Sequence, residues 1–129
     1  MKPVSPAAAF VALIPVLAEA AREVGYALAV HGSMARDLDL VAIPWTDEAV
    51  SAEQLIMRIC AAGGVSLMDT SQKGEDGEFH TIDGSKPTVK PHGRLAWSLH
   101  NTGGRHFYLD VSVLPRAAGH PASQPAVTP

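Results

Sequence analysis

Two stretches near the C-terminus alternate between apolar and polar residues, and this alternation constrains the fold more than any other feature of the chain. Residues 94–100 and 106–114 carry apolar side chains at every second position, which is the period of a β-strand with one buried face. Residues 101–105 between them contain two glycines and an asparagine and predict a hairpin turn. The chain therefore contains a hairpin with one apolar face for a core and one polar face.

A loop over residues 101–105 also predicts which polar residues face each other across this hairpin. The expected pairs are His100 and His106, Ser98 and Tyr108, Ala96 and Asp110, and Arg94 and Ser112. Asp110 would then lie opposite a small side chain, with Arg94 and Ser98 on its diagonals. Space beside a carboxylate with a cation within reach is what a nucleotide and its metal could occupy.

Upstream of the hairpin, the pattern predicts two helices and two strands. In chain order these are a helix within residues 6–24, strands at 26–31 and 37–43, and a helix from the capping box at 51–54 to the glycines at 63–64. Pro15 must kink the first helix or mark a second start, because it lacks a backbone N–H. Residues 65–68 are a candidate short strand.

These elements predict one small α/β (α+β) domain over residues 1–116, with a mixed, twisted sheet of about four or five strands and two helices on one side. A chain of 129 residues that is 47% apolar is large enough for a core of its own. Residues 69–86 are polar and rich in glycine, which predicts a flexible loop. Residues 117–129 are rich in proline and alanine, which predicts a disordered tail.

Charge and cysteine content limit the classes of partner. The formal net charge of −3 provides no basic surface for nucleic acid or for an anionic membrane. The apolar run 7–18 is too short to span a bilayer. Its outline resembles a secretory signal, but prolines interrupt it and it continues into an amphipathic stretch. Cys60 is the single cysteine, which fits the reducing cytoplasm.

A Gly-Ser pair followed by two aspartates is the strongest chemical signal in the sequence. Gly32 and Ser33 end the first predicted strand, and Asp37 and Asp39 share one face of the second. Carboxylates at alternate strand positions lie about 6–7 Å apart at their bases and can bind one or two hard cations. A neighbouring Gly-Ser turn offers backbone N–H groups and a hydroxyl to a phosphate. The pattern therefore indicates metal-assisted phosphoryl chemistry.

This arrangement resembles the polymerase-β-like nucleotidyltransferases, whose signature is an apolar strand, Gly-Ser, an Asp-x-Asp strand and a third carboxylate from a later strand. Gly32, Ser33, Asp37 and Asp39 match that signature, and Asp110 has the strand context of the third carboxylate. Longer stretches also look like those of small phage-encoded members, namely residues 37–45, 90–100 and 108–116.

The resemblance implies a minimal nucleotidyltransferase that moves a nucleotidyl group from a nucleoside triphosphate to an unknown acceptor. It implies that Asp37, Asp39 and Asp110 are catalytic and hold magnesium or manganese, with Asp110 closest to the acceptor. Gly32 and Ser33 would contact the triphosphate. If the protein is phage-encoded, the cytoplasm in which it acts is that of the host.

Two basic residues and one short spacing qualify this expectation. Lys90 and Arg94 are candidate substrate-binding cations that would offset phosphate charge. A Lys-Pro-His-Gly-Arg run is also typical of a solvated loop. Only three residues separate Ser33 from Asp37, fewer than the family has, so we expect a tight turn in place of the family's short helix.

Other readings of the same residues stay open. The Asp-Leu-Asp-Leu strand could be a half-exposed edge with solvated acids. The chain could be a degenerate member that binds a nucleotide or a protein without catalysis, or a small phage protein that inhibits a host factor through its sheet edge or loop. A zinc site formed by His31, His100 and His106 is disfavoured, because their spacing matches no common ligand pattern.

Overall fold

One mixed sheet organises the chain, and its parallel pair lies in the middle. The computed structural model describes residues 6–34, 37–101 and 108–116. The strand order is β1-β2-β8-β7-β3, and β6 also pairs with β7. Strands β2 and β8 run parallel, whereas the other neighbours run antiparallel. The bounds are β1 Tyr26–His31, β2 Leu38–Pro44, β3 Val65–Ser66, β6 Thr88–Val89, β7 Leu95–Asn101 and β8 Tyr108–Val113.

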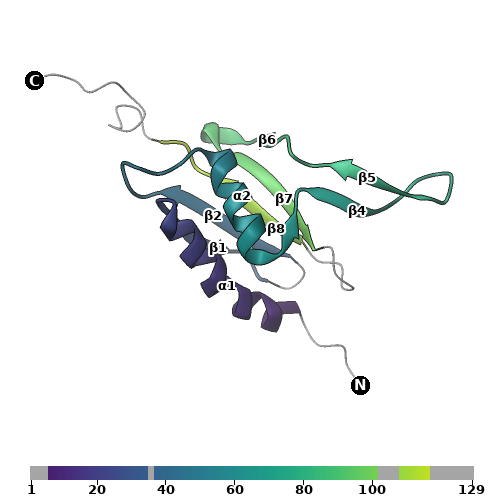
Figure 1. Cartoon of the computed structure of the whole chain (residues 1–129), viewed down its shortest axis with the longest axis horizontal. Helices are drawn as coiled ribbons and strands as arrows, with labels where there is room; N and C mark the ends of the chain where they lie inside the picture. Colours follow the sequence, from purple (N-terminus) through teal and green to yellow (C-terminus); the bar gives the residue numbers. More distant parts are fainter. Residues whose placement is uncertain (1–5, 35–36, 102–107, 117–129) are drawn as a thin grey trace, which may run out of the picture.

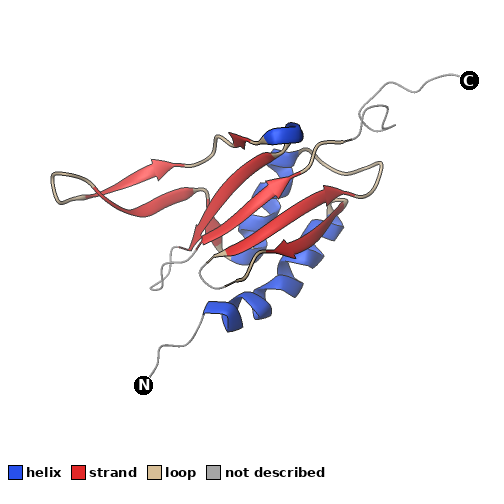
Figure 2. Ribbon diagram, turned by 180° about the vertical axis from the view of Figure 1, so that it is seen from behind, coloured by secondary structure: helices blue, strands red, loops and turns tan. Residues whose placement is uncertain are grey.

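Two helices cover one face of this sheet and leave the other open. They are α1, Pro6–Glu23, and α2, Ala52–Gly63. Figure 2 shows both helices behind the strands, so the face toward the viewer is the open one. The predicted α+β class with two helices on one side is confirmed, and within the described residues the main sheet has six strands where about four or five were predicted. Helix α1 continues through Pro15 as one element, without a second start.

Alternation along the strands explains the core. Every second residue of β2 and β8 is buried against the helices, and Leu40 and Val111 are fully buried partners in neighbouring strands. Helix α1 contributes Phe10 and Leu17, which are 0% exposed. The capping box of α2 forms as predicted, since the Ser51 hydroxyl accepts a hydrogen bond from the Gln54 backbone N–H at 3.2 Å.

The C-terminal hairpin has the predicted faces, but its predicted register is wrong by two residues. Ser98 lies opposite Asp110, and Ala96 lies opposite Ser112. The strands are described only to Asn101 and from Tyr108, so His106 and the turn itself lie outside the described residues. Because side chains alternate with a period of two, a shift of two keeps every residue on its face. The apolar pattern therefore could not distinguish the two registers.

The prediction of a loop at 69–86 is also wrong, because most of this segment forms a second, two-stranded sheet. Strands β4, Met68–Lys73, and β5, Phe79–Asp83, pair antiparallel. We call this pair the arm, and it extends from the main sheet in Figure 1. All five residues of β5 are exposed, so no apolar face marks the strand in the sequence. A turn in which the Asp76 carboxylate accepts from the Glu78 N–H at 2.9 Å joins the two strands.

Short elements complete the described chain. A 3-10 turn, Pro91–Gly93, connects β6 to β7. None of the helices within the described ranges is both long and apolar enough to cross a membrane. The predicted tail at 117–129 lies outside the residues that the structure describes.

Candidate functional site

A row of four polar residues crosses the open face of the sheet at one level. The register places His31 of β1 opposite Asp39 of β2, Asp39 opposite Asp110 of β8, and Asp110 opposite Ser98 of β7. Their side chains share one face, because alternate residues of β2, β7 and β8 point into the core and all four residues line one pocket. Residues 79 positions apart in the sequence thus lie in one line. We call this set the polar row.

The two carboxylates at the centre of the polar row are electrostatically coupled. Burial is the main cause that raises the pKa of Asp110, and the negative charges of Asp39 and Asp37 raise it further. A side-chain hydrogen bond with Asp39 acts in the same direction, because protonated Asp110 can donate it. The Ser98 hydroxyl opposes these effects by donating a hydrogen bond to Asp110 Oδ1 at 2.9 Å. Asp110 therefore holds its proton more tightly than an ordinary aspartate.

An open pocket of about 260 Å³ lies against the polar row. All four members of the row line it, and so do Lys90 at the end of β6 and Thr88 within it. The complete lining is His31, Asp39, Thr88, Lys90, Ala96, Trp97, Ser98, Asp110 and Ser112. Two carboxylates, one ammonium group and hydroxyls in one hollow can hold a charged polar ligand.

The Gly-Ser turn packs directly against Asp39. A Cβ on Gly32 would lie 2.8 Å from Asp39 Oδ2, so a larger residue there would displace the carboxylate. Gly32 has a φ of 83° and Met34 a φ of 58°, and both values lie in the left-handed region. The predicted tight turn between β1 and β2 is consistent with these angles, although residues 35 and 36 lie outside the described part. Gly32 therefore supports Asp39 by leaving room for it.

The structure brings together only some of the predicted site residues. Asp39, Asp110 and Lys90 line the pocket, whereas the described lining does not include Gly32, Ser33, Asp37 or Arg94. Asp37 precedes β2 on the face of Asp39, and its negative charge contributes to the raised pKa of Asp110. Arg94 Nε donates instead to the Pro91 carbonyl at 3.2 Å. Lys90 is therefore the predicted cation that reaches the pocket.

Sequence reasoning missed six of the nine lining residues, and Ser98, His31 and Thr88 show why. Ser98 was placed on the correct face, but the two-residue error in register assigned it to Tyr108 in place of Asp110. His31 was noted only for zinc, although its strand ends beside Asp39. Thr88 belongs to a two-residue strand, which is too short to show any alternation. A correct prediction of the turn would have placed Ser98 opposite Asp110. No local sequence pattern identifies Thr88 as a lining residue.

The donors at the centre of the row suit a hard cation better than zinc. Among the described residues, no group of three or more His, Cys, Asp or Glu side chains is arranged to hold a metal ion. Asp39 and Asp110 still form a carboxylate pair whose like charges disfavour full ionisation, which is a condition that a divalent cation relieves. His31 and His100 lie on β1 and β7 with two strands between them, so the structure does not bring these histidines together.

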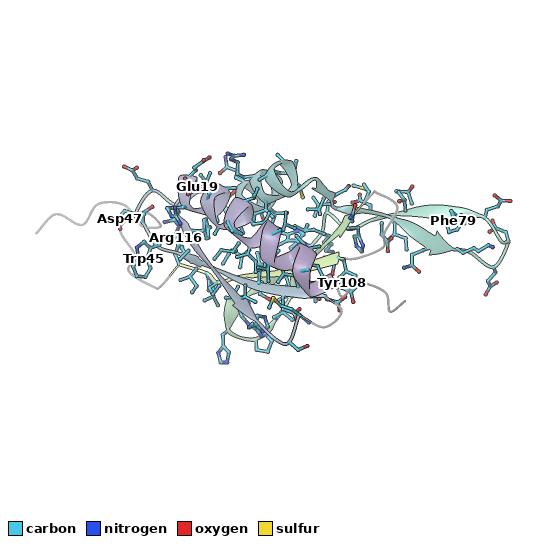
Figure 3. All side chains as sticks on the ribbon, turned by 90° about the horizontal axis from the view of Figure 1, so that it is seen from below. Glu19, Trp45, Asp47, Phe79, Tyr108 and Arg116 are labelled. Carbon is cyan, nitrogen blue, oxygen red and sulfur yellow. The ribbon has the colours of Figure 1, made fainter. Side chains whose placement is uncertain are left out.

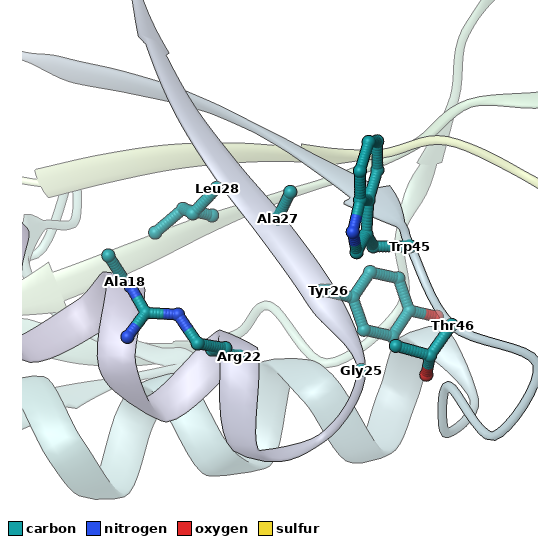
Figure 4. Close-up of a pocket in the computed structure, with 8 residues that line it drawn as sticks. All are labelled: Ala18, Arg22, Gly25, Tyr26, Ala27, Leu28, Trp45 and Thr46. Carbon is teal, nitrogen blue, oxygen red and sulfur yellow. The ribbon is translucent and has the colours of Figure 1, made fainter.

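A second pocket, of about 300 Å³, lies at the β1 edge and has different chemistry. Figure 4 shows Trp45 and Tyr26 at one end of it and Arg22 at the other. Trp45 is 77% exposed, and the Tyr26 hydroxyl donates to the Val50 carbonyl at 2.6 Å. Figure 3 shows Trp45 at the end of the molecule opposite Phe79 of the arm. No carboxylate lines this pocket among the described residues, so it lacks the donors for phosphoryl chemistry.

Comparisons of the chain with protein-family models, with curated proteins and with solved structures gave no match.

Proposed function

We propose that the polar row is the centre of a magnesium- or manganese-dependent nucleotidyltransferase, which transfers a nucleotidyl group from a nucleoside triphosphate to a hydroxyl acceptor. One observation carries the proposal. Asp39 and Asp110, 71 positions apart in the sequence, lie at the same level on neighbouring parallel strands and face a pocket that Lys90 also lines. This is the adjacency that a shared metal site on two strands requires.

The residues present fit a divalent cation in charge and donor type. Asp39 and Asp110 would hold it, and Asp37 would add negative charge from the neighbouring level of β2. Oxygen donors of this kind are those that magnesium prefers. A bound cation would neutralise phosphate charge and lower the pKa of an attacking hydroxyl. We place this activity in the cytoplasm, a reducing compartment in which a lone thiol such as that of Cys60 stays reduced.

The chain's own groups supply the remaining functions. Lys90 lines the pocket and would bind the triphosphate as a point charge. Asp110 lies one strand farther from the Gly-Ser turn than Asp39 does. The Ser98 hydroxyl already donates a hydrogen bond to Asp110. Asp110 is therefore the group placed to receive a proton from an acceptor.

Thermal unfolding with and without metal tests the proposal. Magnesium or manganese at millimolar concentration should raise the Tm of the wild-type protein, because a bound cation stabilises only the folded state. Asp39→Asn and Asp110→Asn should each reduce this rise, and the metal-free variants should be as stable as wild type or slightly more stable, since one repelling charge is lost. Asp47→Asn, outside the polar row, is the matched control and should keep the full response.

The binding of a nucleoside triphosphate, measured by calorimetry, completes the test. We expect binding that depends on metal and weakens in Lys90→Ala. Identical melting of wild type and both aspartate variants, with and without metal, would overturn the proposed function.

A second candidate function is nucleotide binding without catalysis. Gly32 and Ser33, expected at the triphosphate, do not line the pocket that the structure describes. Calorimetric binding that is independent of metal, together with no release of pyrophosphate from the triphosphate, would favour this candidate.

A further inference from the structure

One hydroxyl in the pocket already occupies the position that an acceptor would need. Ser98 Oγ donates to Asp110 Oδ1 at 2.9 Å, which lies within the range over which a base removes a proton. Ser98 is exposed, so an incoming ligand can reach it. Asp39, the other central carboxylate, lies on the opposite side of Asp110.

Other hydroxyls of the pocket lack this relationship. Ser112 lies two residues beyond Asp110 in β8 and faces Ala96, and Thr88 lies beyond Ala96 in β6. Both residues line the pocket one level away from the polar row. Of the hydroxyls that line this pocket in the described chain, only that of Ser98 is hydrogen-bonded to a central carboxylate.

We propose that Ser98 is a nucleotidyl acceptor in its own site, so that the protein attaches a nucleoside monophosphate to this serine. The inference rests on the proposed function and names an acceptor for it. A covalently modified Ser98 would fill the pocket and place phosphate beside Lys90, which lines the same hollow. Self-modification would thereby occupy the site after one turnover.

The step balances without a further reactant. Ser98 Oγ attacks the α-phosphorus of the triphosphate, and an Oγ–phosphorus bond forms while the bond from that phosphorus to the bridging oxygen of the β-phosphate breaks. Pyrophosphate leaves with the electron pair of the broken bond. The hydroxyl proton passes to the Asp110 carboxylate. The product is a phosphodiester between Ser98 and the nucleoside.

Intact-protein mass spectrometry tests the inference directly. The full chain is incubated with magnesium and, in separate reactions, with ATP, GTP, CTP or UTP, and released pyrophosphate is measured in parallel. We expect a mass increase of one nucleoside monophosphate with at least one triphosphate, and peptide fragmentation should locate it at Ser98. Ser98→Ala should lose the label, and Ser98→Thr, which keeps a hydroxyl, should regain part of it.

The controls separate this inference from the proposed function. Ser85→Ala removes an exposed serine outside the pocket and should label as wild type does. Metal-dependent triphosphate binding by Ser98→Ala, measured by calorimetry, shows that its site is intact. Pyrophosphate release by the wild type without any label on Ser98 would overturn the inference and leave the proposed function standing. Absence of metal-dependent triphosphate binding in the wild type would overturn both.

Discussion

The main sheet and the arm are both β-structure, but they differ in how much of each strand is buried. Strands β2 and β8 bury alternate residues completely, including Leu40 and Val111. In the arm every residue of β5 is exposed, and Phe79 and Ile82 are 67% and 50% exposed. Figure 3 shows the arm extending beyond the helices that cover the main sheet.

This difference shows that strand pairing and strand stability have different sources. Strands pair through backbone hydrogen bonds in both regions, yet an isolated two-stranded hairpin is marginally stable in water. The main sheet gains its stability from the apolar contacts of one face. Its other face is therefore available for polar groups, and it carries the polar row.

Truncation of a core side chain should have the largest effect. Leu40 belongs to β2, which lies between β1 and β8, and its side chain is fully buried. We therefore expect Leu40→Ala to lower the free energy of unfolding by about 2–5 kcal/mol. Urea denaturation measures it. Ile82→Ala in the arm is the control and should change stability by no more than about 0.5 kcal/mol. Equal losses at the two positions would break the comparison between sheet and arm.

Hydrogen exchange should show the same division at the level of the backbone. Amides of β2 and β8 should exchange only on global unfolding, whereas those of β4 and β5 should exchange many-fold faster through local opening, because few apolar contacts hold the arm. Mass spectrometry or NMR can measure both sets in one sample. Protection of most arm amides over hours would show that the arm belongs to the cooperative core.

The pH dependence of stability should distinguish the open face of the sheet from the exposed strand β5 of the arm. The pKa of Asp110 is raised in the folded state, so its contribution favours folding below the unfolded pKa of about 4 and is lost as the pH rises through the folded value. Asp110→Asn removes this loss. Without metal, the stability of the variant relative to wild type should therefore increase from acid to neutral pH.

Urea denaturation at several pH values checks this expectation. Asp83, in the arm, has a pKa lowered by hydrogen bonds from Ser85, so Asp83→Asn should show the opposite trend with pH. A difference between wild type and Asp110→Asn that stays constant with pH would mean that Asp110 titrates normally in the folded protein.

Substitution of the most exposed aromatic residue of the arm should have the smallest effect. Lys73 Nζ lies 5.8 Å from the centre of the Phe79 ring, and an exposed contact of this kind contributes about 0.5–1 kcal/mol at most. Phe79→Ser should therefore shift the free energy of unfolding by no more than that amount in urea denaturation. A loss as large as that of Leu40→Ala would show that the arm packs against something that stabilises the fold.

The parts of the fold that were predicted correctly have signals within a few residues of one another. The alternation of Leu38, Leu40 and Ala42 marks the buried face of β2, and the Ser51 to Gln54 capping box marks the start of α2. The arm was missed because β5 is exposed at every residue and therefore carries no apolar period. Its hydrogen bonds depend on a partner strand and on a turn at Asp76, which local composition describes equally well as a loop.

The sequence by itself determined which side chains share a face, because the period of a strand and the start of a helix are local properties. It therefore placed Asp39, Asp110 and Ser98 on polar faces. Only the tertiary structure decided that these residues are neighbours. The parallel pairing of β2 with β8 joins segments about 70 residues apart, and shifting a register by two residues leaves every face unchanged. Local patterns do not depend on which strands pair or on their register. Packing and chain connectivity determine both.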